Sequence, residues 1–230
     1  MTRGTTLAQI VSKYRAEAGR SMEVNVGVGD LEAQKNLIRR TQDVLYEGFD
    51  WSFLRVDVHK DLYAGQRFYD VPIDLNFDRI EKIHVWYNNY PQEVTRGIRP
   101  EQYSIHDSRN DERGDPVLRW DIRWTDGAEQ IEVWPIPETN GMTLEFTGIR
   151  KLRPLVSDAD VADLDDNLIA LFAAAETLER QKSADSKPVQ AKAISLYNAL
   201  KGRSQTGSRP LIFGQGKTEV VRERLTVKYP

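Results

Sequence analysis

Apolar residues recur at helical spacing near both ends of the chain, and they alternate with polar residues in between. Residues 5–18 and 30–47 each carry one apolar stripe, so both segments are predicted to be amphipathic helices. The same spacing returns later and predicts a helix over residues 160–180 and another from Pro188 to Gly202. The two ends of the chain are therefore expected to be helical.

Alternation of apolar and polar residues between positions 51 and 150 predicts antiparallel strands. The alternating runs are 53–59, 83–87, 117–124, 129–134 and 142–149. Three dipeptides suit tight turns with positive φ, namely Asn88-Asn89, Asp126-Gly127 and Asn140-Gly141. The last three runs are therefore expected to form an antiparallel meander.

Glycine and acidic residues mark where the helices are expected to end and begin. Gly19 and Gly48 follow the first two apolar stripes and suit helix ends. Ser157 with Asp160 three residues later resembles a capping box, so the third helix is expected to begin near residue 160. The aspartates at 158, 160 and 163 would then lie at the positive end of its dipole.

Neither helical block alone could bury its apolar stripes well. We therefore predict an α+β fold in which a helical bundle is built from both ends of the chain and an antiparallel β domain is inserted into it. The predicted boundaries are 1–50 and 151–203 for the two parts of the bundle, 51–150 for the β domain and 204–230 for an extended C-terminal arm.

The composition narrows the function classes. The chain has 230 residues, a formal net charge of −3 and no cysteine. This charge argues against binding of nucleic acid through bulk charge alone, and the lack of cysteine excludes disulfides, thiolate nucleophiles and cysteine-ligated metals. No apolar run has the length of a signal peptide or a membrane span. We therefore expect a soluble protein that is not exported by this route and has no membrane partner.

The segment PLIFGQGKTEVV, residues 210–221, resembles the end of a phosphate-binding loop. A complete loop needs an earlier glycine at the position where this chain has Leu211, and it must lead into a helix. Only twelve residues follow Thr218, and the last of them suit an extended chain. We therefore predict that no nucleotide and no other cofactor binds.

Catalytic and metal sites are not predicted either. The histidines His59, His84 and His106 do not stand at metal-binding spacing. No carboxylate lies in an apolar sequence context that would indicate a raised pKa. The chain is therefore not expected to be an enzyme, although a hydrolase with an unidentified carboxylate pair stays open at this point.

All five tryptophans lie in the predicted β domain or at its start. They are Trp51, Trp86, Trp120, Trp124 and Trp134. Core packing is the simplest explanation for tryptophans in alternating strands. Exposed indoles could instead stack on sugars or bases, so a carbohydrate- or nucleic-acid-binding module is the alternative function.

The last segment of the chain combines basic with apolar residues. A solvated tail would carry fewer β-branched and aromatic residues, so the segment is expected to lie extended along an acidic partner or a sheet edge. The residues expected to dock are Arg209, Pro210, Leu211, Ile212, Phe213, Gly214, Gly216, Lys217, Arg222, Arg224, Leu225, Val227 and Tyr229.

Two stretches of the sequence resemble the head-to-tail adaptor proteins of tailed bacteriophages, and most of all the tail tubular protein A group of short-tailed phages. In residues 37–75 the shared pattern is a helix ending in Gly-aromatic, then Trp-x-Phe, a turn glycine and Val-Pro. It is carried by Gly48, Phe49, Trp51, Phe53, Gly65, Val71 and Pro72. Residues 131–178 resemble the adaptor segment in which strand, proline, turn and strand lead into an alanine-rich helix. The residues expected to have structural roles are Trp51, Phe53, Gly65, Pro72, Leu168, Leu171, Phe172 and Ala175.

The resemblance implies a non-enzymatic structural protein of the virion, located at the head–tail junction after assembly in the host cytoplasm. Such adaptors form a ring, commonly dodecameric, on the portal protein. They carry the next tail or nozzle component and surround a channel for genomic DNA, and their C-terminal arm grips the portal. The small residues Ala170, Ala173, Ala174 and Ala175 would permit close helix packing, either within a subunit or between subunits.

Overall fold

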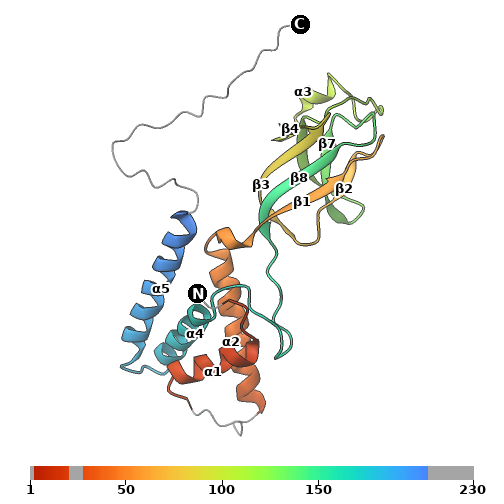
Figure 1. The fold of residues 1–230 in the computed structure, drawn as a ribbon. Coiled ribbons are helices and arrows are strands. Elements are labelled where there is room, and N and C mark those ends of the chain that lie inside the picture. The colour runs from red at the N-terminus through yellow and green to blue at the C-terminus, as the bar shows by residue number, and fades with distance from the viewer. Residues whose placement is uncertain (1–2, 21–27, 207–230) are drawn as a thin grey trace, which may run out of the picture.

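The computed structural model describes residues 3–20 and 28–206, which form the α+β fold expected from the sequence (Figure 1). The helices are α1 (Leu7–Glu17), α2 (Val28–Glu47), α3 (Pro100–Tyr103), α4 (Asp166–Arg180) and α5 (Ser186–Thr206), with a short 3₁₀ helix η1 (Ser52–Leu54). The strands are β1 (Arg55–Asp61), β2 (Phe68–Asp70), β3 (Leu75–Tyr87), β4 (Tyr90–Glu93), β5 (Thr95–Arg96), β6 (Arg119–Thr125), β7 (Ala128–Trp134) and β8 (Thr143–Arg150).

Helices α1, α2, α4 and α5 gather at one end of the molecule, away from the sheets (Figure 1). Their apolar stripes meet in one hydrophobic core, which also includes Trp51, Leu54 and Ile149. Helix α4 contacts each of the other three helices. Its four alanines are between 0% and 8% exposed, so their small side chains serve close packing inside the subunit.

The N-terminal residues bond directly to the segment that precedes α4. The N–H of Leu7 donates to the carbonyl of Asp160 (2.9 Å), and the N–H of Ala162 donates to the carbonyl of Thr5 (3.1 Å). Thr6 also forms an antiparallel bridge with Val161. Segments that are far apart in the sequence thus lie together, while the division of the chain into domains at residues 50 and 151 stays a prediction.

Between residues 55 and 150 the chain forms two four-stranded sheets (Figure 1). The first sheet is antiparallel and has the strand order β1-β8-β3-β4. The second has the order β2-β7-β6-β5, in which only the short β5–β6 pair is parallel. Buried side chains from both sheets form a second hydrophobic core, which is separate from the core of the helices.

The predicted meander of the last three strand runs is wrong. Strands β6 and β7 do form a hairpin, with positive φ at Asp126 (54°) and Gly127 (80°). Strand β8 instead joins the other sheet, where it pairs with both β1 and β3. Pro135 and Pro137 follow β7 directly, and a proline cannot donate a hydrogen bond to a neighbouring strand. The chain therefore leaves the second sheet after Trp134.

Two other turn predictions had different outcomes. Asn88 and Asn89 have φ of 51° and 64° and join the antiparallel strands β3 and β4, as predicted. Gly141 has φ of 100°, but the strands on either side of this turn do not pair with each other. The end of α5 also differs, because the helix continues past Gly202 to Thr206.

The prediction that Ser157 and Asp160 form a capping box at the start of the third long helix is wrong. Helix α4 begins later, at Asp166. The N-cap is Asp165, whose carboxylate accepts from the N–H of Leu168 (3.1 Å). Ser157 and Asp160 close a turn instead. The Asp160 carboxylate accepts from the N–H groups of Ser157 and Val156, at 2.6 Å each, and these hydrogen bonds lower its pKa. The turn ends there because the next residues form the bridge to the N-terminal segment rather than a helix.

Candidate functional site

The connector between β8 and α4, residues 151–165, is held by a buried carboxylate. The side chain of Asp163 is 0% exposed and lies between the guanidinium groups of Arg150 and Arg153, with closest N–O distances of 2.5 Å to each. Burial raises the pKa of Asp163, but the hydrogen bonds from Arg153 and Arg150 lower it more, so the net pKa lies below the ordinary 3.8. The ion pairs join the end of the first sheet to the residues that lead into α4.

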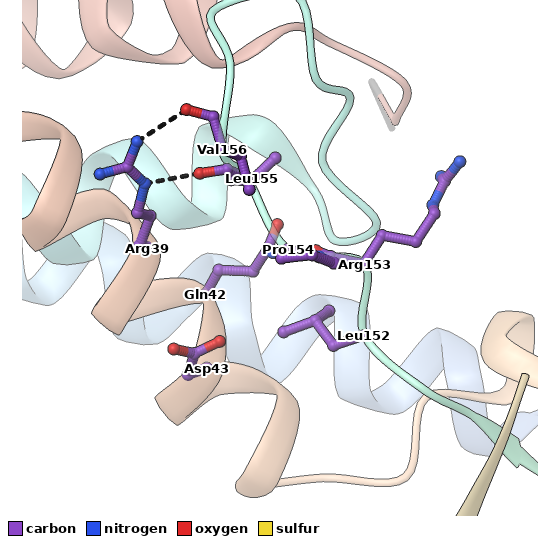
Figure 2. Close-up of a pocket in the computed structure, with 8 residues that line it drawn as sticks. All are labelled: Arg39, Gln42, Asp43, Leu152, Arg153, Pro154, Leu155 and Val156. Atoms are coloured by element: carbon purple, nitrogen blue, oxygen red, sulfur yellow. Dashed lines mark hydrogen bonds between the residues drawn. The ribbon is translucent and has the colours of Figure 1, made fainter. Parts of the chain in front are cut away.

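A cavity of about 400 Å³ lies between α2 and this connector (Figure 2). Arg39 closes one side by donating to the carbonyl oxygens of Leu155 (2.5 Å) and Val156 (3.0 Å). Asp43 lies on the same helix, below Arg39 in the view, and its pKa is raised by burial and then by the charge of Glu47. The lining is completed by Gln42, Leu152, Arg153 and Pro154.

Gln42 reaches from α2 toward the connector and leaves one polar atom unpaired. Its side chain is almost fully buried, and its Oε1 has no hydrogen-bond partner among the described residues. Its Nε2 donates only a long hydrogen bond of 3.5 Å to the carbonyl of Arg153. A buried acceptor without a donor costs about 1–3 kcal/mol. Gln42 is therefore not optimised for stability.

Replacing Gln42 by leucine is expected to leave the free energy of unfolding unchanged or to raise it by up to about 1 kcal/mol, because the unpaired acceptor is removed. The matched control is Gln34 on the same helix, which is equally buried. Its Oε1 accepts from Arg15 (2.8 Å) and its Nε2 donates to Asp30 (2.6 Å). Gln34→Leu should cost about 1–3 kcal/mol in urea unfolding. Equal losses in both variants would contradict this prediction.

Besides Asp163 and the N-cap Asp165, two further buried carboxylates form ion pairs that the sequence did not indicate. Asp166 is 0% exposed and forms an ion pair with Lys13 of α1. Glu132 is 1% exposed, and its two oxygens accept from Arg67 (2.5 Å) and Arg123 (2.8 Å). Each acid pairs with a cation that is distant in the sequence or lies on a neighbouring strand. Spacing along the chain therefore could not reveal these ion pairs. Charges paired in this way support the fold and are not free for acid–base chemistry.

Three of the five tryptophans are core residues. Trp51, Trp120 and Trp134 are at most 4% exposed. Trp86 and Trp124 are exposed, but they lie on β3 and β6, which belong to different sheets. No ring contact joins these two indoles in the described part of the chain. The alternative of a stacking surface for sugars or bases is therefore not favoured.

The histidines are closer together in the fold than in the sequence. His59 on β1 and His84 on β3 both lie opposite Glu145 of the strand between them. Glu93 extends this row onto β4. Even so, within residues 3–20 and 28–206 no group of three or more acidic or histidine side chains is placed to hold a metal ion.

Most of the predicted structural residues lie in the helical core or against it. They are Trp51, Phe53, Leu168, Leu171, Phe172 and Ala175. Gly65 has φ of 77°, which suits a glycine turn, and the carbonyl of Pro72 accepts from the N–H of Leu75 (3.1 Å). Any functional role of these residues stays a prediction. The predicted docking residues, from Arg209 to Tyr229, lie outside the described residues.

The sequence from residue 5 to residue 214 matches the SU10 adaptor protein family. The chain belongs to this family. The match covers most of the chain, including both helical parts and the sheets between them. No curated protein matches the chain. The narrower resemblance to the tail tubular protein A group is not confirmed by this match and stays a prediction.

Family membership makes this adaptor a structural protein of a bacteriophage, and the family is not known for enzyme activity. It implies a location at the head–tail junction of the virion and association with portal and tail components. In the part of the adaptor that the structure describes, no helix has both the length and the apolar composition needed to cross a membrane. The paired carboxylates and the two cores accordingly serve the architecture of a virion component.

Proposed function

We propose that this adaptor forms a ring of twelve identical subunits on the portal. The ring carries the next tail or nozzle component. Genomic DNA passes through the centre of the ring without sequence-specific contact. The observation that supports this proposal is membership of the SU10 adaptor family over residues 5–214. The modest net charge of −3 is compatible with DNA that passes through rather than binds.

We propose that the C-terminal arm docks on the portal. Because α5 continues to Thr206, the arm begins at residue 207 rather than at the predicted 204. Leu211, Ile212 and Phe213 supply an apolar anchor, and each contributes about 1.5–3 kcal/mol if fully buried, before the cost of ordering the chain. The glycines Gly214 and Gly216 let the backbone turn tightly. The basic residues of the arm set the register against acidic groups on the portal or on a neighbouring adaptor subunit. The remaining residues form the helical bundle and the inserted β domain.

A chain that ends at Gly207 tests this assignment. We expect it to fold with nearly the same Tm as the full chain, because the helical and sheet cores lie before residue 207. We also expect it to fail to join portal complexes in a sedimentation or negative-stain assay. Normal assembly of the shortened chain would show that the arm is not the docking element. Unfolding of the shortened chain would show that the arm belongs to the core of the subunit.

A further inference from the structure

Strand β1 is an edge strand, and its outer side carries no further strand from residues 3–20 and 28–206. It lies at the end of the first sheet and pairs only with β8, in an unbroken register from Arg55 to Asp61. In the described part of the chain, the backbone of these seven residues bonds only to β8, apart from the N–H of Arg55, which donates to the carbonyl of Ser52. The strand contains no proline and no bulge, two common devices that prevent a further strand from pairing. It is therefore open to an added strand.

The two faces of β1 differ in chemistry. Asp57, His59 and Asp61 are exposed on one face, where the row around Glu145 adds further negative charge. Val56, Val58 and Lys60 point to the other face. A groove of about 660 Å³ runs beside Val56 and Val58 and is lined on its far side by connector residues that include Leu152 and Pro154. A fitting strand would have a basic face and an apolar face.

The C-terminal segment of this chain has that alternation. In TEVVRERLTV, residues 218–227, Arg222 and Arg224 fall on one face of an extended chain, whereas Val221, Leu225 and Val227 fall on the other. The segment is also attached close to β1. Ser204, near the end of α5, accepts from the N–H of Ser52 (2.9 Å), just before β1 begins. The linker from the end of α5 to this segment, residues 207–218, can span on the order of 40 Å when extended, which lets the segment reach beyond its own subunit.

We infer that residues 219–228 of a second copy of this chain add an antiparallel strand to the outer edge of β1. Arg222 lies opposite Asp61, Leu225 opposite Val58 and Val227 opposite Val56. In this register Glu223 also meets Lys60, so charged and apolar positions match from Asp61 to Val56. At the end of the strand Lys228 falls opposite Arg55, which carries the same charge. Each copy gives one strand and receives one, which is the head-to-tail contact that a closed ring requires. This inference rests on the proposed ring.

The chain has no cysteine, so this register can be tested with a pair of introduced thiols. The test variant carries Val58→Cys and Leu225→Cys in the full chain, assembled in the presence of the portal protein and treated with a mild oxidant. Residues opposite each other on adjacent strands are close enough for a disulfide. The matched control carries Val58→Cys and Thr226→Cys, which moves the second thiol to the opposite face. Non-reducing gels report the products.

We expect a ladder of covalent multimers from the test variant and mainly monomer from the control. Equal yields from the two variants would overturn the inference, since chance collisions do not depend on the face. A disulfide within one chain would show that the added strand comes from the same subunit, which would overturn the inference that a second copy donates it. Negative-stain images of the unoxidised chain with its portal separate the two proposals. Rings without a ladder overturn only the added strand. Images without rings overturn the proposed ring, whatever the gels show.

Discussion

Replacing Trp51 by alanine is expected to lower the free energy of unfolding by about 3–5 kcal/mol. The indole is 1% exposed and packs against Phe49 and Tyr197, with ring centroids 5.0 and 5.9 Å away. Its Nε1 also donates to the carbonyl of Leu45 (3.0 Å). This carbonyl is one of the last four of α2, which have no partner within the helix. Alanine would leave both a cavity and an unpaired carbonyl where α2, α5 and η1 meet.

Urea unfolding followed by circular dichroism measures the loss, and Tm should fall by about 2–4 °C for each kcal/mol in a chain of this length. Trp51→Phe is the matched control, because it keeps most of the ring volume and removes the hydrogen bond. It should cost about 1–2 kcal/mol plus a smaller packing loss. An alanine variant as stable as the phenylalanine variant would show that the packing of Trp51 is not important.

Replacing Asp163 by alanine is expected to cost about 2–4 kcal/mol, because it leaves the guanidinium groups of Arg150 and Arg153 without their buried partner. This expected cost is toward the low end of the cost of breaking a buried ion pair, since the side chain of Arg153 is 60% exposed and can be hydrated. Asp158→Ala is the control. Asp158 pairs with Lys35 (2.7 Å) on the surface, and such pairs contribute at most about 1 kcal/mol. Equal losses in the two variants would contradict the structural role of Asp163.

The lowered pKa of Asp163 also predicts how the free energy of unfolding depends on pH. Its pKa in the folded chain is below the ordinary 3.8. A lowered pKa means that the contribution of Asp163 is fully present above that ordinary value and is lost as pH falls through the folded pKa. The difference between wild type and Asp163→Ala should therefore be constant at neutral pH and shrink below about pH 4. A difference that grows as the solution is acidified would contradict the lowered pKa.

Helices and strands could be predicted from the sequence because they depend on neighbours within a few residues. The stripes of α1 and α2 and the positive-φ turn at Asn88-Asn89 are local patterns, and the structure has these elements where they were predicted. The prediction of where α4 begins was wrong, although its sequence signal was local as well. The N–H of Ser157 donates to the Asp160 carboxylate, as it would in a capping box, but the Ser157 hydroxyl also donates to this carboxylate instead of accepting from the N–H of Asp160. The sequence of the two residues does not distinguish the turn from the capping box.

The sequence by itself determined the α+β class, the helical ends with strands between them, the lack of cysteine chemistry and the incomplete phosphate loop. Only the tertiary structure decided that β8 lies between β1 and β3, that Asp163 pairs with Arg150 and Arg153, and that β1 keeps an open edge. The physical reason is range. Periodicity and turn chemistry act between near neighbours, whereas strand order and buried ion pairs depend on which distant segments share a core, and many pairings of similar strands satisfy the same local pattern.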